Sequence, residues 1–141
     1  MSEPRYASQF GGLWPDRSDA ADALAQRVKT GSITAKEADL LQFWMDNGYV
    51  ILPKAVKSSV IDAALRDIDI MYEKGAGYVE NYEAGTQIVQ VEPRHRGILH
   101  KLLDAHGLTE NLRAAVMSPA VTRFMNLIFD EPALAFQGLY F

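Results

Sequence analysis

The sequence predicts an α+β protein in which helices pack on a few strands, and three observations support this class. The chain has 141 residues, which is enough for one domain with a packed core. Apolar residues recur at spacings of three and four in several stretches, a pattern typical of amphipathic helices. Short β-branched and aromatic runs at residues 49–52, 87–92 and 134–141 are typical of strands.

Residues 1–17 are predicted to form an extended amino-terminal arm, because they mix proline, glycine, serine and isolated aromatic residues without a period. Its large apolar side chains could dock on the rest of the protein: Tyr6, Phe10, Leu13 and Trp14. The folded part is then residues 18–141. It opens with a helix from Ser18, supported by Ala21, Leu24, Ala25 and Val28 and ended by Gly31.

The second helix has the clearest signals of the chain. Thr34 and Glu37 have the spacing of a capping box, and Asn47-Gly48 is a typical helix end. Leu40, Leu41, Trp44 and Met45 give this helix an apolar face. The run "GYVILP" follows at once and predicts a strand at residues 49–52 that ends at Pro53.

The third helix is predicted to be capped by Ser58 or Ser59 and to end at Gly75 and Gly77. Its apolar stripe consists of Val60, Ile61, Ala64, Leu65, Ile68 and Met71. Charged residues fill the opposite face: Asp62, Arg66, Asp67, Asp69 and Glu73. Such a face is more often a solvated surface than a source of acid–base catalysis, and we interpret it as a surface.

The remaining residues predict one more strand, three helices and a closing strand. Ile88, Val89 and Val91 indicate the strand, and a helix is expected from Ile98 to Ala105, ended by Gly107. Thr109 caps the next helix, and Ser118-Pro119 opens the last one, which ends at Asp130-Glu131-Pro132. The closing run "ALAFQGLYF", residues 133–141, predicts a strand that is buried on both faces.

Composition excludes several classes of function. The formal net charge is -4 and no basic block is present, so nucleic acid is not an expected partner. The absence of cysteine excludes disulfides and thiolate chemistry. We find neither a signal peptide nor a run of about 18 apolar residues, so we expect a cytoplasmic protein without a membrane partner.

Catalytic motifs are absent from the sequence. The histidines are His95, His100 and His106, and His100 lies four residues before Asp104 on the predicted helix. Two such side chains are too few for a metal site, and surface hydrogen bonding is the commoner role of such a pair. Zinc-protease spacing, a phosphate-binding glycine loop and a G-x-S-x-G turn are all missing. The serines Ser58, Ser59 and Ser118 are explained as helix caps.

Two features leave alternatives open. The "EPRHRG" cluster places Arg94, His95 and Arg96 between a strand and a helix, where two guanidinium groups could hold a carboxylate or phosphate. Arginines in such a loop more commonly tie the loop down or remain in solvent. Gln137 is a lone amide in an apolar strand, so it needs partners if it is buried, either a ligand or a neighbouring strand.

Taken in order, "LLQFWMDNGYVILPKAV", "IDAALRDIDIMY" and "LHKLLDAHGLTENLRAAVMSPAVTRFMNLIFDEPALAFQGLYF" resemble the amino-terminal half of the phytanoyl-CoA dioxygenase family. The resemblance covers about residues 38–141. It implies helices packed on the first strands of a double-stranded β-helix, or jelly roll. It also implies an oxygenase that uses iron(II) and 2-oxoglutarate to hydroxylate acyl-CoA or other small molecules.

The resemblance also implies which site residues to expect. In the family, the strand similar to "AFQGLYF" precedes a His-x-Asp pair, and a second histidine and a basic residue follow much later. The histidines here read "HRG", "HKL" and "HGL", so no catalytic or metal-binding residue can be assigned. Gln137 is the one position carried over, as a residue that faces the cofactor and substrate pocket. The chain itself is expected to lack the catalytic half, to bind neither iron nor 2-oxoglutarate tightly, and to be inactive.

A second hypothesis is a non-catalytic helical binding module. Helices at about residues 35–47, 59–74 and 119–129 would pack on a small sheet, and the exposed sheet edge would pair with a strand of another chain. This hypothesis depends on the absence of a complete active site. Neither hypothesis identifies a substrate from the sequence.

Overall fold

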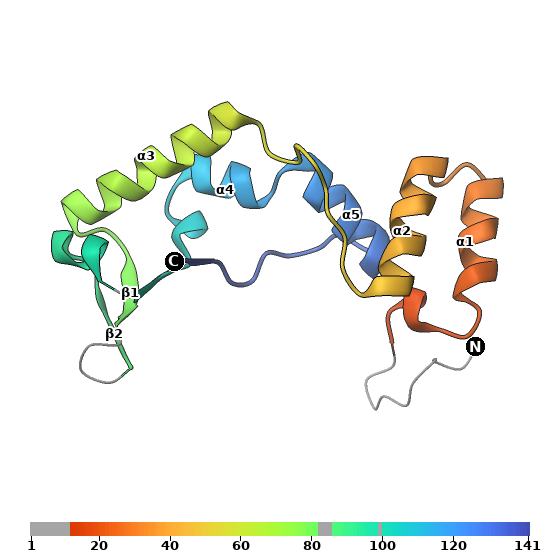
Figure 1. Ribbon diagram of the computed structural model, residues 1–141, viewed down its shortest axis with the longest axis horizontal. Coiled ribbons are helices and arrows are strands. Elements are labelled where there is room, and N and C mark those ends of the chain that lie inside the picture. The colour runs from red at the N-terminus through yellow and green to blue at the C-terminus, as the bar shows by residue number, and fades with distance from the viewer. Residues whose placement is uncertain (1–11, 82–85, 99) are drawn as a thin grey trace. The chain divides into compact units, whose positions relative to one another are not determined.

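The computed structural model describes residues 12–81, 86–98 and 100–141, in which helices combine with a four-stranded antiparallel sheet (Figure 1). The predicted α+β class is therefore confirmed. The described residues divide into two units. The first unit runs to Pro53 and includes Thr122–Ala133, and the second consists of Lys54–Val121 and Leu134–Phe141.

The first unit is helical. It contains the short 3-10 helix η1 (Trp14–Asp16), α1 (Ala20–Lys29), α2 (Ala35–Asn47) and most of α5 (Pro119–Phe129). Their apolar faces meet in one core: Trp14, Leu24, Ile33, Leu41, Phe124, Leu127 and Ile128. The Trp14 indole Nε1 donates to the Leu127 carbonyl at 2.7 Å. Docking of Leu13 and Trp14 is thus confirmed, whereas Tyr6 and Phe10 lie outside the described residues.

Local signals place both ends of α2 correctly. The Glu37 backbone N–H donates to Thr34 Oγ1 at 3.2 Å, and Glu37 Oε2 accepts from the Thr34 backbone N–H at 2.7 Å. This is the predicted capping box. At the other end Gly48 adopts φ 76°, a left-handed conformation that favours glycine. Glu37 also accepts from Arg123 Nε on α5 at 2.7 Å, so one carboxylate serves two helices.

We expect Glu37 to make the free energy of unfolding of the first unit depend on pH. The hydrogen bond from Arg123 and then that from the Thr34 backbone lower the Glu37 pKa from 4.5 to about 2. Because the folded-state pKa is depressed, this stabilisation is complete above pH 4.5 and is lost as the pH falls toward 2. We expect wild type to be more stable than Glu37→Gln at neutral pH. The difference in free energy of unfolding between the two should shrink as the pH falls from 4.5 toward 2. Urea unfolding at several pH values measures this, and Arg123→Gln should weaken the same pH dependence. A difference that does not change with pH would contradict the prediction.

The strand predicted at residues 49–52 is not formed. None of the described residues pairs with this segment as a strand. Val50 and Leu52 instead pack against the helical core of the first unit. The β-branched residues favour an extended backbone, but a strand also needs a neighbour for its N–H and C=O groups.

The second unit combines α3 (Ser58–Lys74) and α4 (Glu110–Val116) with the sheet. The strands are β1 (Tyr78–Asn81), β2 (Gln87–Gln90), β3 (His100–Leu103) and β4 (Leu139–Tyr140), in the order β2-β1-β3-β4. Val79 pairs with Val89 on one side and with Leu102 on the other. The core consists of Ile68, Met71, Tyr72, Val79, Val91, Leu102 and Ala105.

The prediction of a helix from Ile98 to Ala105 is wrong. Residues 100–103 form β3, and the short 3-10 helix η3 (Ala105–Gly107) follows. His100 and Leu102 point into the unit while Lys101 and Leu103 are less buried, an alternation with the period of a strand. A four-residue run cannot distinguish helix from strand by periodicity alone, and pairing with β1 decides it here. β1 itself was not predicted.

Two of the predicted side-chain caps are also wrong. α3 begins after Lys57 without a side-chain cap, so neither Ser58 nor Ser59 has that role. Ser118 precedes α5, but its hydroxyl is buried and has no hydrogen-bond partner among the described residues. The Thr109 cap is confirmed, because its Oγ1 accepts from the Leu112 backbone N–H at 3.2 Å.

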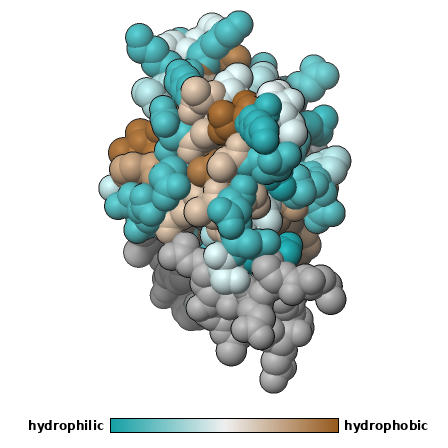
Figure 2. Space-filling view, turned by 90° about the vertical axis from the view of Figure 1, so that its right-hand side faces the viewer, coloured by the Kyte–Doolittle hydropathy of each residue, from teal (hydrophilic) through white to brown (hydrophobic). Residues whose placement is uncertain are grey.

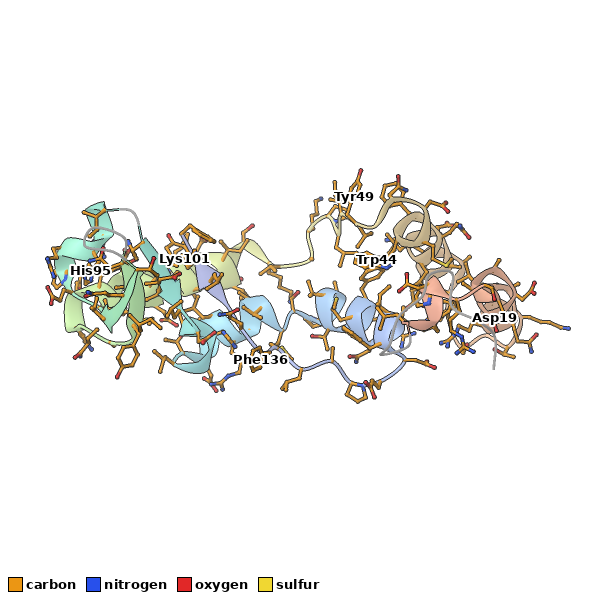
Figure 3. The ribbon with its side chains drawn as sticks, turned by 90° about the horizontal axis from the view of Figure 1, so that it is seen from below. Asp19, Trp44, Tyr49, His95, Lys101 and Phe136 are labelled. Carbon is orange, nitrogen blue, oxygen red and sulfur yellow. The ribbon has the colours of Figure 1, made fainter. Side chains whose placement is uncertain are left out.

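The closing strand is shorter and far more exposed than predicted. Only Leu139–Tyr140 pair with β3. Leu134 is 86% and Phe136 is 88% exposed, and Phe136 is labelled on the segment that leads to β4 (Figure 3). The prediction of a strand buried on both faces is therefore wrong for residues 133–141, because β3 is the only strand of the described ranges that pairs with this segment.

Candidate functional site

A buried tyrosine–histidine pair is the most chemically distinctive feature of the second unit. Tyr72 lies on α3 and His100 on β3, and their side chains are 4% and 6% exposed. The Tyr72 hydroxyl and His100 Nε2 are 2.5 Å apart, and His100 Nδ1 lies 2.7 Å from the Ile98 carbonyl. A carbonyl can only accept, so Nδ1 carries the proton and Nε2 accepts from Tyr72. Both ring nitrogens of His100 thus have a hydrogen-bond partner.

The Tyr72 hydroxyl is held in its protonated form. Burial raises the pKa of Tyr72, and the neighbouring Tyr140 raises it further, while the Arg96 guanidinium acts in the opposite direction. The Arg96 guanidinium carbon lies 5.6 Å from the centre of the Tyr72 ring. A phenol that keeps its proton is a hydrogen-bond donor and not a nucleophile, so the arrangement favours a positioning role for Tyr72.

His95 is fully buried in the 3-10 helix η2 (Pro93–Gly97) and is labelled in Figure 3. Its Nδ1 accepts from the Glu92 backbone N–H at 2.9 Å, which assigns the proton to Nε2. Nε2 has no hydrogen-bond partner among the described residues. The His95 and His100 ring centres are 6.1 Å apart. The sequence could not indicate this proximity, because neither residue belongs to a motif.

The two arginines of the "EPRHRG" cluster tie the loop down, as the second alternative predicted. Arg94 Nε lies 2.6 Å from Glu92 Oε2 within the loop. Arg96 Nη2 donates to Asp69 on α3 at 2.7 Å. The two guanidinium groups therefore bind different carboxylates, Arg94 that of Glu92 and Arg96 that of Asp69. Among the carboxylates of α3, Asp62 and Glu73 are exposed and Asp69 forms this ion pair. Asp67 is half-buried and accepts from Asn111 Nδ2 on α4 at 3.1 Å.

The residues around these histidines do not fit an iron centre. The acceptor nitrogens of His95 and His100 are already engaged by Glu92 and Tyr72. Asp104 does not follow His100 on a helix, and its Oδ1 accepts from the Gly138 backbone N–H at 2.8 Å. Within the described part of the chain, no group of three or more histidine and carboxylate side chains could hold a metal ion. A facial triad needs two histidines and a carboxylate with free donor atoms.

Gln137 does not lie in a buried site. Its side chain is exposed and lies between α5 and β4 in a segment without regular secondary structure. Neither a ligand nor a neighbouring strand is needed as its hydrogen-bond partner, because water can hydrogen-bond to an exposed amide. Its assignment to a cofactor and substrate pocket stays a prediction.

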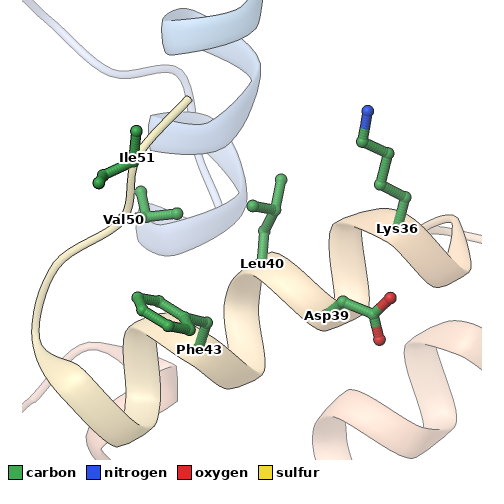
Figure 4. A pocket seen from close by; sticks show the side chains of 6 residues that line it. All are labelled: Lys36, Asp39, Leu40, Phe43, Val50 and Ile51. Carbon is green, nitrogen blue, oxygen red and sulfur yellow. The ribbon is translucent and has the colours of Figure 1, made fainter. Parts of the chain in front are cut away.

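A pocket in the first unit was not predicted from the sequence. It has a volume of about 360 Å³ and lies between α2 and the segment that follows it. Lys36 and Asp39 lie toward one end, while Leu40, Phe43 and Val50 form its apolar wall (Figure 4). On the face of this unit seen in Figure 2, a band of apolar side chains is bordered by hydrophilic ones. The available signal is the apolar "GYVI" run next to a helix end, which by its residue types predicts a strand.

Comparisons with known proteins found no relative of this chain. No family model matches it, and neither the curated proteins nor the solved structures include a match. None of the helices in the described ranges is both long and apolar enough to cross a membrane. The fold and site therefore define an α+β protein in which His95 and His100 are engaged in internal hydrogen bonds. The Nδ1 atom of the third histidine, His106, is buried and has no hydrogen-bond partner among the described residues.

Proposed function

We propose that this chain is the amino-terminal part of an iron(II)- and 2-oxoglutarate-dependent oxygenase that resembles the phytanoyl-CoA dioxygenase family. The complete cytoplasmic enzyme would hydroxylate an acyl or other small-molecule substrate. One observation carries the proposal: the order of the helix that runs into "NGYVILP", the long helix after it, and the "SPAV" helix followed by "AFQGLYF". α2, α3 and α5 correspond to the helical segments of that order.

The open edge of the sheet supports the same proposal. β4 is one of the two edge strands, and among the described residues it pairs only with β3. Three large apolar side chains of the closing segment are strongly exposed: Leu134, Phe136 and Phe141. A double-stranded β-helix needs further strands, and a strand added along β4 would provide the neighbour that this edge lacks.

The 141-residue chain by itself should show no iron-dependent turnover. None of its three histidines begins a His-x-Asp or His-x-Glu pair, and His95 and His100 are engaged elsewhere. Incubated with iron(II), 2-oxoglutarate, ascorbate and O2, the purified chain should release no succinate above a protein-free control. Sustained succinate release that is abolished by an iron chelator would contradict the expectation.

The coding sequence that follows the codon for Phe141 tests the family assignment. The proposal expects an in-frame His-x-Asp or His-x-Glu soon after it and a second histidine much later. The longer polypeptide should then consume 2-oxoglutarate, and replacing the first of these histidines by alanine should abolish the consumption. A reading frame without such a pair would remove the proposal.

The second candidate function is the non-catalytic binding module. The observation that favours it is the apolar edge at β4, which no other strand in the described part of the chain covers and where a partner strand could add to the sheet. Sedimentation of the purified chain over a range of concentrations distinguishes the candidates. A monomer with a cooperative melt favours an autonomous module, whereas aggregation or strand-exchanged oligomers favour a part of a larger sheet.

A further inference from the structure

A second cavity lies beside the tyrosine–histidine pair, entirely within the second unit. Its volume is about 200 Å³. Side chains of α3, η2, β3 and the closing segment line it, among them Asp69, Tyr72, Arg96, His100, Tyr140 and Phe141. The size suits a single six-membered ring, since an apolar protein cavity of about 150 Å³ can hold benzene.

Rigid polar and aromatic groups form part of the cavity wall. Tyr72 and His100 are buried and satisfy each other's hydrogen bonds, so they do not need a ligand to be stable. The Tyr72 oxygen still has lone-pair capacity, because it donates its only proton to His100. Tyr140 and Phe141, both exposed to solvent, also line the cavity, so their rings are available to contact a planar ligand.

Arg96 is the cationic group of the cavity. Its Nη2 donates to both the backbone carbonyl and the carboxylate of Asp69, at 3.2 and 2.7 Å. Its Nε and Nη1 donors have no hydrogen-bond partner among the described residues. A guanidinium has five N–H donors, so a carboxylate can bind to the remaining ones. Arg94 differs, because it pairs with Glu92 and does not line this cavity.

We propose that this cavity binds a small aromatic carboxylate, with the ring between the aromatic side chains and the carboxylate on Arg96. Asp69 opposes the binding, because it competes for the same guanidinium and adds a negative charge. Its removal should therefore strengthen the binding. This site is independent of the iron chemistry discussed above, and its test uses the chain alone, so either proposal can fail without the other.

Benzoate is the probe, and benzyl alcohol is its neutral counterpart of similar size. NMR titration of the 15N-labelled full chain should show saturable shifts at Ile98 and Tyr140 with benzoate. Benzyl alcohol should bind about two- to fivefold more weakly, the range for one half-exposed ion pair. Arg96→Gln should reduce the affinity for benzoate to that for benzyl alcohol. Asp69→Asn should instead raise the benzoate affinity by about two- to fivefold.

Arg94→Gln is the matched control, since it removes an arginine from the same short helix without changing the cavity. It should leave benzoate affinity within a factor of about two. The Asp69→Asn variant distinguishes an effect on binding from an effect on folding, because an unfolded protein cannot gain affinity for benzoate. Unsaturable benzoate shifts, equal losses for Arg94→Gln and Arg96→Gln, or no gain with Asp69→Asn would each overturn the proposal.

Discussion

Replacing Leu41 by alanine should lower the free energy of unfolding of the first unit by about 2 to 5 kcal/mol. Leu41 is 0% exposed and belongs to the core that α1, α2 and α5 share with Trp14. The substitution removes buried methyl groups and leaves a cavity that the surrounding helices can fill only in part. This is the largest single-residue effect that we expect in the protein.

Urea unfolding followed by tryptophan fluorescence measures this change. The chain has two tryptophans, Trp14 and Trp44, and both pack in the core of the first unit. Ile51→Ala is the control in the same unit, because Ile51 is 72% exposed and its loss should cost less than about 0.5 kcal/mol. Equal losses for the two variants would show that the core is not where the structure places it.

Replacing Tyr72 by phenylalanine should destabilise the second unit by about 1 to 3 kcal/mol. The ring volume is kept, but His100 Nε2 loses the donor that it faces in a buried position. Urea unfolding followed by the NMR signals of β1 and β3 reports on this unit, which contains no tryptophan. Tyr78→Phe is the control, because Tyr78 is largely exposed.

A double-mutant cycle separates the hydrogen bond from simple packing. If Tyr72 and His100 satisfy each other, Tyr72→Phe combined with His100→Phe should cost less than the two single changes added together. The reason is that the double variant leaves neither partner buried and unpaired. Strictly additive losses would mean that the two side chains do not form the hydrogen bond.

Local rules predicted the helices well. The Thr34–Glu37 capping box, the left-handed Gly48 and Gly75, and the Thr109 cap all lie where the sequence indicated. Each of these features involves groups within a few residues of one another, so sequence spacing is enough to define them. The predictions that Ser58, Ser59 and Ser118 cap helices were wrong. A serine near a helix start caps the helix only if its hydroxyl accepts a hydrogen bond from a backbone N–H of the first turn.

The strands were predicted poorly for a different reason. Residues 98–105 were assigned to a helix, residues 49–52 to a strand, and β1 was missed. A strand depends on its partners, and those of β3 are β1, about twenty residues earlier, and β4, which lies still farther away along the chain. Burial of the closing segment likewise depends on whether neighbouring strands are present, which its own composition cannot determine.

The amino-acid sequence by itself determined the α+β class, the extents of most helices, and the absence of a His-x-Asp pair, since these follow from composition, period and short-range spacing. Only the tertiary structure decided that Tyr72 meets His100 across 28 residues, and that Arg96 rather than Arg94 lines a cavity. Such contacts form when segments distant in sequence pack together. Their free energy depends on burial and geometry that no local pattern contains.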